Sequence, residues 1–165
     1  MLARFRSLLR VDAAATVPVV AIALLRSMGL FRALPALELE AAARAGTDLS
    51  VDAGSPLITE GELADGYFAI ADGFVEVTSG GRLMATLGRR EGFGEIAVLR
   101  DLRRTARVAA KTDALLFAVQ RDPFVTAVTR HAESSRRAGS IIDERLEERG
   151  VSPGSRVDAE GPSAR

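Results

Sequence analysis

The feature that most restricts the possible folds is a long run of short, β-rich segments, from residue 47 to residue 120, separated by turn residues. Asp72-Gly73 and Ser79-Gly80-Gly81 are turns of the kind that need positive φ, and they predict β-hairpins. Short strands divided by frequent turns are typical of an antiparallel sandwich or barrel. The predicted strands are residues 49–52, 56–59, 67–71, 74–78, 82–87, 108–111 and 115–119.

Helical patterns lie on both sides of this β-rich region. Two helices are predicted within residues 17–46, the second of which begins at Pro35. Two more are predicted within residues 121–149, the first with Asp122 as its cap and Pro123 as its first residue. The sequence therefore predicts a mainly β fold with flanking helices. We expect a β jelly-roll barrel over residues 47–120, with two N-terminal helices and two C-terminal helices.

These elements are expected to form one domain, residues 17–149, between a basic amphipathic lead-in (1–16) and a disordered tail (150–165). The chain has 165 residues and no cysteine, so a disulfide framework and a thiol nucleophile are excluded. Its 22 acidic and 22 basic residues balance, so no overall field attracts nucleic acid. The single histidine, His131, lies beyond the β-rich region, and no G-x-S-x-G elbow occurs. We therefore expect no catalytic site, no metal site and no direct nucleic-acid binding.

The sequence FGEIAVLRDLRRTARV predicts a binding site for a small phosphate-bearing ligand. Gly94 allows a ligand to approach the backbone closely, and the apolar run after Glu95 is long enough for one or two helical turns. The first amides of such a turn, near Ile96 and Ala97, have no intrahelical partners and attract anions. Arg104 follows, and a guanidinium can donate two hydrogen bonds to a phosphate. A carboxylate at position 95 suits a sugar hydroxyl, so the pattern as a whole indicates a nucleotide.

These residues resemble the phosphate-binding cassette of cyclic nucleotide-binding domains, which are found in the catabolite activator protein, cyclic-nucleotide-dependent protein kinases and cyclic-nucleotide-gated channels. FGEIAVL, a spacer of four residues and RTA match the cassette without a gap. IALLRSMGLFRALPALELEAAA and AGSPLITEGELADGYFAIADGFVEV are similar to the helical lead-in and the early strands of the same family. The resemblance extends from about residue 17 to residue 149.

The resemblance implies a role for each cassette residue. Glu95 would accept a hydrogen bond from the ribose 2′-hydroxyl, Arg104 would hold the cyclic phosphate, and the others would offer backbone groups or line the pocket. The implied function is a non-catalytic sensor or regulatory domain for cAMP or cGMP, without a cofactor. On this hypothesis, Arg104→Ala should cost about 2 to 5 kcal/mol of binding free energy and hardly change folding. The implied ligand-binding residues are Gly94, Glu95, Ile96, Ala97, Arg104, Thr105 and Ala106.

Three alternatives stay open at this point. Arg104 and Glu95 could pair with each other in a purely structural hairpin. The chain could be a structural or interaction domain that keeps the fold without binding nucleotide. The identity of the base is also undecided, because the Arg-Thr-Ala order at Thr105 is associated with cyclic GMP sensors in the resembling family, but bacterial-type members do not follow this rule.

The last predicted helix carries an apolar stripe of Ala138, Ile141, Ile142 and Leu146. This stripe would pack on the barrel, form a dimer seam, or act as a lid over the purine, since the resembling family moves this helix on ligand binding. Ile142 and Arg145 are the candidate lid residues. Arg145 would either contact the base or be a solvated side chain.

The predicted partners are a cyclic nucleotide and an effector, which is either a module of a larger protein or a separate protein. A homodimer through the C-terminal helix is one option. The longest apolar stretch, residues 17–25, is about half the length needed to cross a bilayer. The expected location is therefore the cytoplasm, with membrane association only through a larger parent protein.

Overall fold

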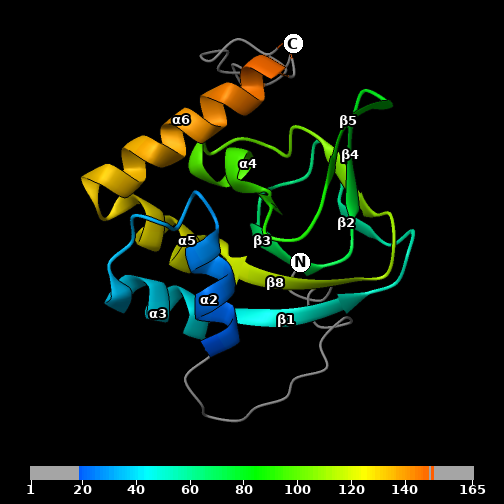
Figure 1. Ribbon diagram of the computed structural model, residues 1–165. Helices are drawn as coiled ribbons and strands as arrows, with labels where there is room; N and C mark the ends of the chain where they lie inside the picture. Colours follow the sequence, from blue (N-terminus) through cyan, green and yellow to red (C-terminus); the bar gives the residue numbers. More distant parts are fainter. Residues whose placement is uncertain (1–18, 149, 151–165) are drawn as a thin grey trace, which may run out of the picture.

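The computed structural model describes residues 19–148 and residue 150, so the predictions for the lead-in and for most of the tail lie outside the described residues. Within this part, eight strands form two four-stranded antiparallel sheets (Figure 1). The first sheet has the strand order β1-β8-β3-β6, and the second has the order β2-β7-β4-β5. The strands are β1 (Gly46–Val51), β2 (Pro56–Ile58), β3 (Gly66–Asp72), β4 (Val75–Ser79), β5 (Arg82–Leu87), β6 (Gly92–Phe93), β7 (Arg107–Ala110) and β8 (Ala114–Gln120).

The predicted class, mainly β with flanking helices, is confirmed, but the two sheets do not close into a barrel. Among the described residues no strand ladder joins one sheet to the other, so each sheet keeps two edge strands. Every predicted strand overlaps an observed one. The predicted hairpin turns are also present, with positive φ at Gly73 (85°), Gly80 (55°) and Gly81 (79°).

Two strand predictions were incomplete. The first strand begins at Gly46 and not at residue 49, because Gly46 already pairs with Val119 of β8. An added Cβ at Gly46 would lie 2.2 Å from the Phe117 ring, so only glycine fits this close approach. The two-residue strand β6 was missed because so short a segment has no periodicity, although it pairs Phe93 with Phe68 of β3.

The four predicted flanking helices are present as α2 (Val19–Ser27), α3 (Ala36–Ala45), α5 (Arg121–Thr129) and α6 (Ala132–Glu148). The predicted cap of α5 was wrong: Gln120, not Asp122, stands at the N-cap. Strand β8 runs directly into α5, and the Arg121 amide donates to the Asp65 carbonyl at 2.9 Å. In the described part of the chain, no helix combines the length and apolarity needed to cross a membrane.

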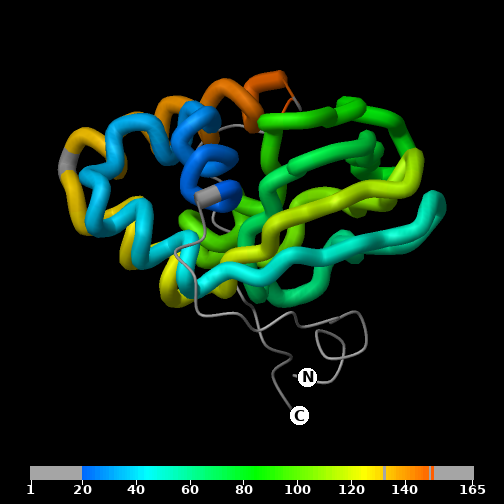
Figure 2. The backbone as a smooth tube through the Cα atoms, turned by 60° about the horizontal axis from the view of Figure 1, so that its bottom comes forward, coloured from blue at the N-terminus to red at the C-terminus, as the bar shows by residue number. Residues whose placement is uncertain are grey.

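The helices gather at one end of the sheets, as Figure 2 shows. Aromatic rings fill this junction: the Tyr67 ring stacks on Phe124 with centroids 4.7 Å apart, and Phe31 lies 5.4 Å from Tyr67. A second core, which includes Phe68 stacked on Phe93 at 5.1 Å, lies among the strands. The short helix α4 (Glu95–Leu99) follows β6 directly, and α6 runs alongside it.

Candidate functional site

The site is built around the turn that joins β6 to α4. Gly94 occupies this turn with φ of 95°, in the left-handed region. An added Cβ would lie 2.8 Å from Nη1 of Arg104 and 3.0 Å from the Gly66 carbonyl oxygen, so glycine is required for both conformation and space. Residues 95–98 are buried as α4 begins. The predicted glycine turn and helix start are thus present.

Arg104 lies beside this turn and is only 4% exposed. Its Nη1 donates to the Gly94 carbonyl at 2.9 Å, and its Nη2 donates to Asp65 Oδ1 at 2.6 Å and to the Gly66 carbonyl at 2.9 Å. These bonds use three of the five N–H donors that a guanidinium carries, which leaves two for another acceptor. Burial lowers the pKa of Arg104 and Asp65 opposes this shift, so the guanidinium stays charged.

Glu95 is buried even more deeply, with 2% of its surface exposed. Its Oε1 accepts a hydrogen bond from Nη1 of Arg145, which also donates to the Gly92 carbonyl at 3.0 Å. Its Oε2 is buried and has no hydrogen-bond partner within the described chain. Burial lowers the pKa of Arg145 and Glu95 raises it, with a net upward direction, so the guanidinium stays charged.

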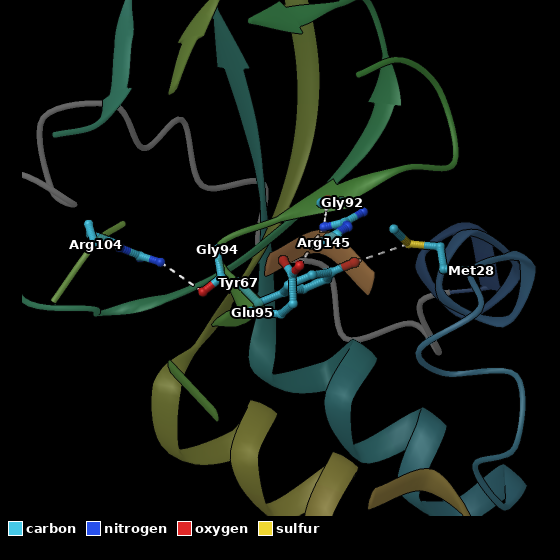
Figure 3. Close-up of polar contacts among 7 residues, drawn as sticks. All are labelled: Met28, Tyr67, Gly92, Gly94, Glu95, Arg104 and Arg145. Atoms are coloured by element: carbon cyan, nitrogen blue, oxygen red, sulfur yellow. Dashed lines mark hydrogen bonds and ion pairs between the residues drawn. The ribbon is translucent and has the colours of Figure 1, made fainter. Parts of the chain in front are cut away.

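Figure 3 shows Arg104 directed at Gly94 and the Glu95 carboxylate directed at Arg145. The alternative in which Arg104 and Glu95 simply pair with each other is therefore wrong. Each has its own partner of opposite charge, Asp65 for the arginine and Arg145 for the glutamate. This leaves one cation and one anion on the same hollow, and both are buried.

The hollow lies between α4, the segment after Arg104 and the strands, and has a volume of about 310 Å³, part of which is open to solvent. All seven residues that the sequence predicts for the site line it, so the structure brings them together. The sequence did not identify the residues of the apolar wall, which come from β2, β4, β6 and β7. The lining residues are Ile58, Val77, Phe93, Gly94, Glu95, Ile96, Ala97, Arg104, Thr105, Ala106 and Val108.

Helix α6 covers α4 from outside the hollow. Ile142 and Leu146 form a small apolar cluster with Ile96, and Arg100 and Asp143 form an ion pair beside it. The candidate lid residues thus contact the predicted cassette. Arg145 is not simply a solvated side chain, because it is bonded to Glu95 and Gly92. Its contact with a base stays a prediction.

Most of the apolar stripe of α6 is buried within the chain, and Ile141 is half-buried, which bears on the predicted dimer seam. Ala138, Ile142 and Leu146 are all buried by residues of the same chain. A homodimer through this face would require α6 to leave its present position.

Among the described residues, no three potential ligands cluster to hold a metal ion.

Sequence reasoning missed two functional neighbours, Asp65 and Tyr67. Asp65 precedes β3 and lies 39 residues before Arg104, so no local spacing connects the two. Tyr67 reads as an ordinary strand residue, but its ring lies beside Glu95 and its hydroxyl contacts Met28 Sδ at 3.8 Å (Figure 3). Burial, followed by the charge of Glu95, raises the pKa of Tyr67, so its hydroxyl stays protonated.

Comparisons with known proteins agree with this geometry. Residues 48–131 match the family model of the cyclic nucleotide-binding domain. A cAMP-dependent protein kinase regulatory subunit of Yarrowia lipolytica is 36% identical over 102 residues, which are 61% of this chain and 27% of that protein. A cGMP-dependent protein kinase of Eimeria tenella is 34% identical over 108 residues, which are 65% of this chain and 11% of that protein.

A solved structure, the regulatory domain of Toxoplasma gondii PKA with cAMP, superimposes with a TM-score of 0.69 at 24% identity, over 82% of this chain and 52% of that one. This likeness supports the fold. Because the family model matches about half of the chain, the chain belongs to the cyclic nucleotide-binding domain family. It spans about a quarter or less of the two kinase-related relatives that it matches.

Proposed function

We propose that this chain is a non-catalytic sensor that binds cAMP or cGMP in the hollow beside α4. The observation that supports this most strongly is the pair of opposite charges on that hollow. Arg104 retains two N–H donors, and Glu95 retains one buried carboxylate oxygen without a partner. A buried acceptor without a partner is costly, and a ligand hydroxyl would remove that cost.

Each end of a cyclic nucleotide then has a matching group. The cyclic phosphate takes the free donors of Arg104 and the amides at the start of α4, near Ile96 and Ala97. The ribose 2′-hydroxyl donates to Oε2 of Glu95. The ion pair with Arg145 offsets the negative charge of this carboxylate, which would otherwise repel the phosphate. The apolar strand residues form a wall for the sugar and the base.

Helix α6 is the element through which binding would be signalled. It contacts α4 through the Ile96–Ile142–Leu146 cluster and through the Arg145–Glu95 and Arg100–Asp143 ion pairs. A ligand that holds Glu95 and α4 more firmly in one position therefore favours one position of α6. Binding and α6 position must affect each other equally, because the coupling is reciprocal. The receiver is an effector module of a larger protein or a partner protein. One relative is a cAMP-dependent protein kinase regulatory subunit, which supports a regulatory role.

Isothermal titration calorimetry with cAMP and cGMP tests this proposal. One-to-one binding of either nucleotide is expected, and linear 5′-AMP or 5′-GMP should bind far more weakly because the cyclic phosphate is lost. If neither cyclic nucleotide gives a measurable heat of binding at millimolar concentration, the result would instead support a structural domain that keeps the fold without the ligand.

A further inference from the structure

A second pocket, which we call the α2–α6 pocket, lies beside α6 and is separate from the hollow beside α4. Its volume is about 420 Å³, part of which is open to solvent. Glu95 is the only described residue that lines both spaces. Figure 3 shows three of its residues, Met28, Tyr67 and Arg145, close together. The complete lining is residues 28–30, Tyr67, residues 90–92, Glu95, Ile141 and Arg145.

One part of this pocket is apolar and buried. Met28 and Leu30, in the turn after α2, are buried, and Ile141 of α6 is half-buried. The Tyr67 ring is also buried, and its hydroxyl already contacts Met28 Sδ. A small apolar group of a ligand would therefore be removed from water here.

Two cations lie on the more exposed part of the pocket. Arg145 donates through Nη1 to Glu95 and Gly92, which leaves its Nε and Nη2 donors for a ligand. Arg90 is exposed, and among the described residues its guanidinium has no hydrogen-bond or ion-pair partner. Both guanidinium groups can therefore bind a carboxylate.

The backbone at Arg90 places an acidic side chain on the same pocket. Neighbouring side chains of an extended strand point to opposite faces. Arg90 interrupts this alternation, because its φ of 67° is in the left-handed region, which a residue with a side chain rarely adopts. Glu91 lines the pocket together with Arg90. Its Oε2 accepts a hydrogen bond from the Gly88 amide at 2.8 Å, so its Oε1 is left for another donor.

The charges on the lining balance, with Arg90 and Arg145 opposite in sign to Glu91 and Glu95. A ligand with a net charge would upset this balance, whereas a zwitterion would not. A carboxylate on the guanidinium groups, an ammonium on Glu91 and an apolar side chain against Met28 match an apolar α-amino acid. We propose that the α2–α6 pocket is a second ligand site, which binds a small apolar amino acid such as leucine.

An NMR titration of the full chain with L-leucine, in the absence of nucleotide, tests this proposal. Saturable shifts of the amide signals of residues 28–30 and 90–92 are expected. Three analogues each lack one part of leucine: 4-methylpentanoate lacks the ammonium, 3-methylbutylamine lacks the carboxylate, and glycine lacks the apolar side chain. Each should bind at least about fivefold more weakly than leucine. Equal binding of any of the three would overturn the assignment to an apolar amino acid, and no saturable shift at millimolar leucine would overturn the site itself.

Variants of the pocket separate ligand binding from stability. Arg90→Gly removes the guanidinium and suits the left-handed backbone, so it should bind leucine at least about fivefold more weakly while its Tm stays equal or rises. Arg89→Gly is the matched control, because Arg89 is exposed and does not line the pocket, and it should leave the Kd for leucine unchanged. An added Cβ at Gly29 would lie 3.7 Å from Ile141 Cδ1, an ordinary contact, so Gly29→Leu should fold and block the pocket.

Wild-type affinity for leucine in folded Arg90→Gly or in folded Gly29→Leu would overturn the proposal. These titrations contain no nucleotide, so their outcome does not depend on the proposed function. A chain that binds a cyclic nucleotide but not leucine would lose this inference alone, and a chain that binds leucine but neither cyclic nucleotide would lose the proposed function alone.

Discussion

Arg104 is a residue with two tasks, one in the fold and one in the proposed site. Its side chain satisfies the carbonyls of Gly94 and Gly66 and pairs with Asp65, and all of these contacts exist before any ligand is present. The sequence alone suggested that Arg104→Ala would hardly change folding. The structure changes that expectation, because truncation would leave buried carbonyl groups without donors.

We predict that Arg104→Ala lowers the free energy of unfolding by about 1 to 3 kcal/mol, in addition to abolishing tight nucleotide binding. Arg104→Lys separates the two effects better, since lysine keeps the charge and loses the planar fork. It should remain folded and bind the nucleotide at least tenfold more weakly, as measured by urea unfolding and calorimetry. The exposed Arg44→Lys, on an i,i+4 pair with Glu40, is the control and should change neither quantity. Full affinity in folded Arg104→Lys would contradict the phosphate role.

Glu95 gives a second prediction at this scale, because one of its oxygens is bonded and the other is not. If the ribose 2′-hydroxyl donates to the free oxygen, the 2′-deoxy cyclic nucleotide should bind the wild type more weakly by about 1.5 to 3 kcal/mol, the value of a hydrogen bond to a charged group. In the Glu95→Gln variant, removing the 2′-hydroxyl from the ligand should weaken the binding free energy much less. Calorimetry of the four combinations measures this coupling, and Glu40→Gln serves as the exposed control. If the missing 2′-hydroxyl weakens binding by the same amount in the wild type and in the variant, Glu95 does not bind the ribose hydroxyl.

At the scale of elements, α4 and α6 are joined by both apolar and charged contacts. The apolar cluster between them is flanked by two ion pairs, one at each end of α4. Only one of these pairs, Arg145–Glu95, also reaches the hollow. In the proposed mechanism, this pair is the contact that would transmit binding from the site to the C-terminal helix.

We predict that Arg145→Met, which keeps the length of the side chain and removes its charge, weakens cyclic nucleotide binding by about tenfold. The reason is that Glu95 would be left as a buried, uncompensated carboxylate facing a phosphate. Amide hydrogen exchange in α6 should become faster, and the protection that ligand gives to α6 in the wild type should be lost. Arg137→Met, which changes an arginine of α6 that belongs to neither of these ion pairs, is the matched control. Unchanged affinity together with normal ligand protection of α6 would show that the pair does not couple site and helix.

The elements also show how far the sequence could predict this molecule. Features coded by neighbouring residues were predictable: the hairpin turns at Gly73 and Gly80, the glycine before α4, and the flanking helices. Features that depend on distant residues were not. The pairing of Arg104 with Asp65 and of Glu95 with Arg145 joins positions 39 and 50 residues apart, and no periodicity reports such contacts. The same holds for β6, which is a strand only because β3 lies beside it.

For the whole molecule, the arrangement explains why the site lies where it does. The sheets supply a rigid wall, the helices gather at one end, and α4 lies between them under α6 (Figure 1). The hollow is therefore lined by several separate segments of the folded chain, including β2, β4, the start of α4 and residues 104–106, and the proposed ligand would contact them together. In the unfolded chain these segments are apart, so a ligand that needs all of them binds only the folded state.

This yields a prediction for global stability. Because the ligand binds the native state alone, it should stabilise that state by about 2.7 kcal/mol at a concentration 100 times its Kd. For a chain of this size, this corresponds to an increase in Tm of about 5 to 11 °C. Differential scanning calorimetry with the preferred cyclic nucleotide measures the shift, which should grow with the logarithm of ligand concentration. The matching linear 5′-nucleotide should give little shift in Tm. The Arg104→Lys variant should need a higher ligand concentration to reach the same shift in Tm, in proportion to its higher Kd. A Tm that stays constant up to millimolar cAMP and cGMP would mean that the hollow beside α4 is part of a scaffold and not a nucleotide site.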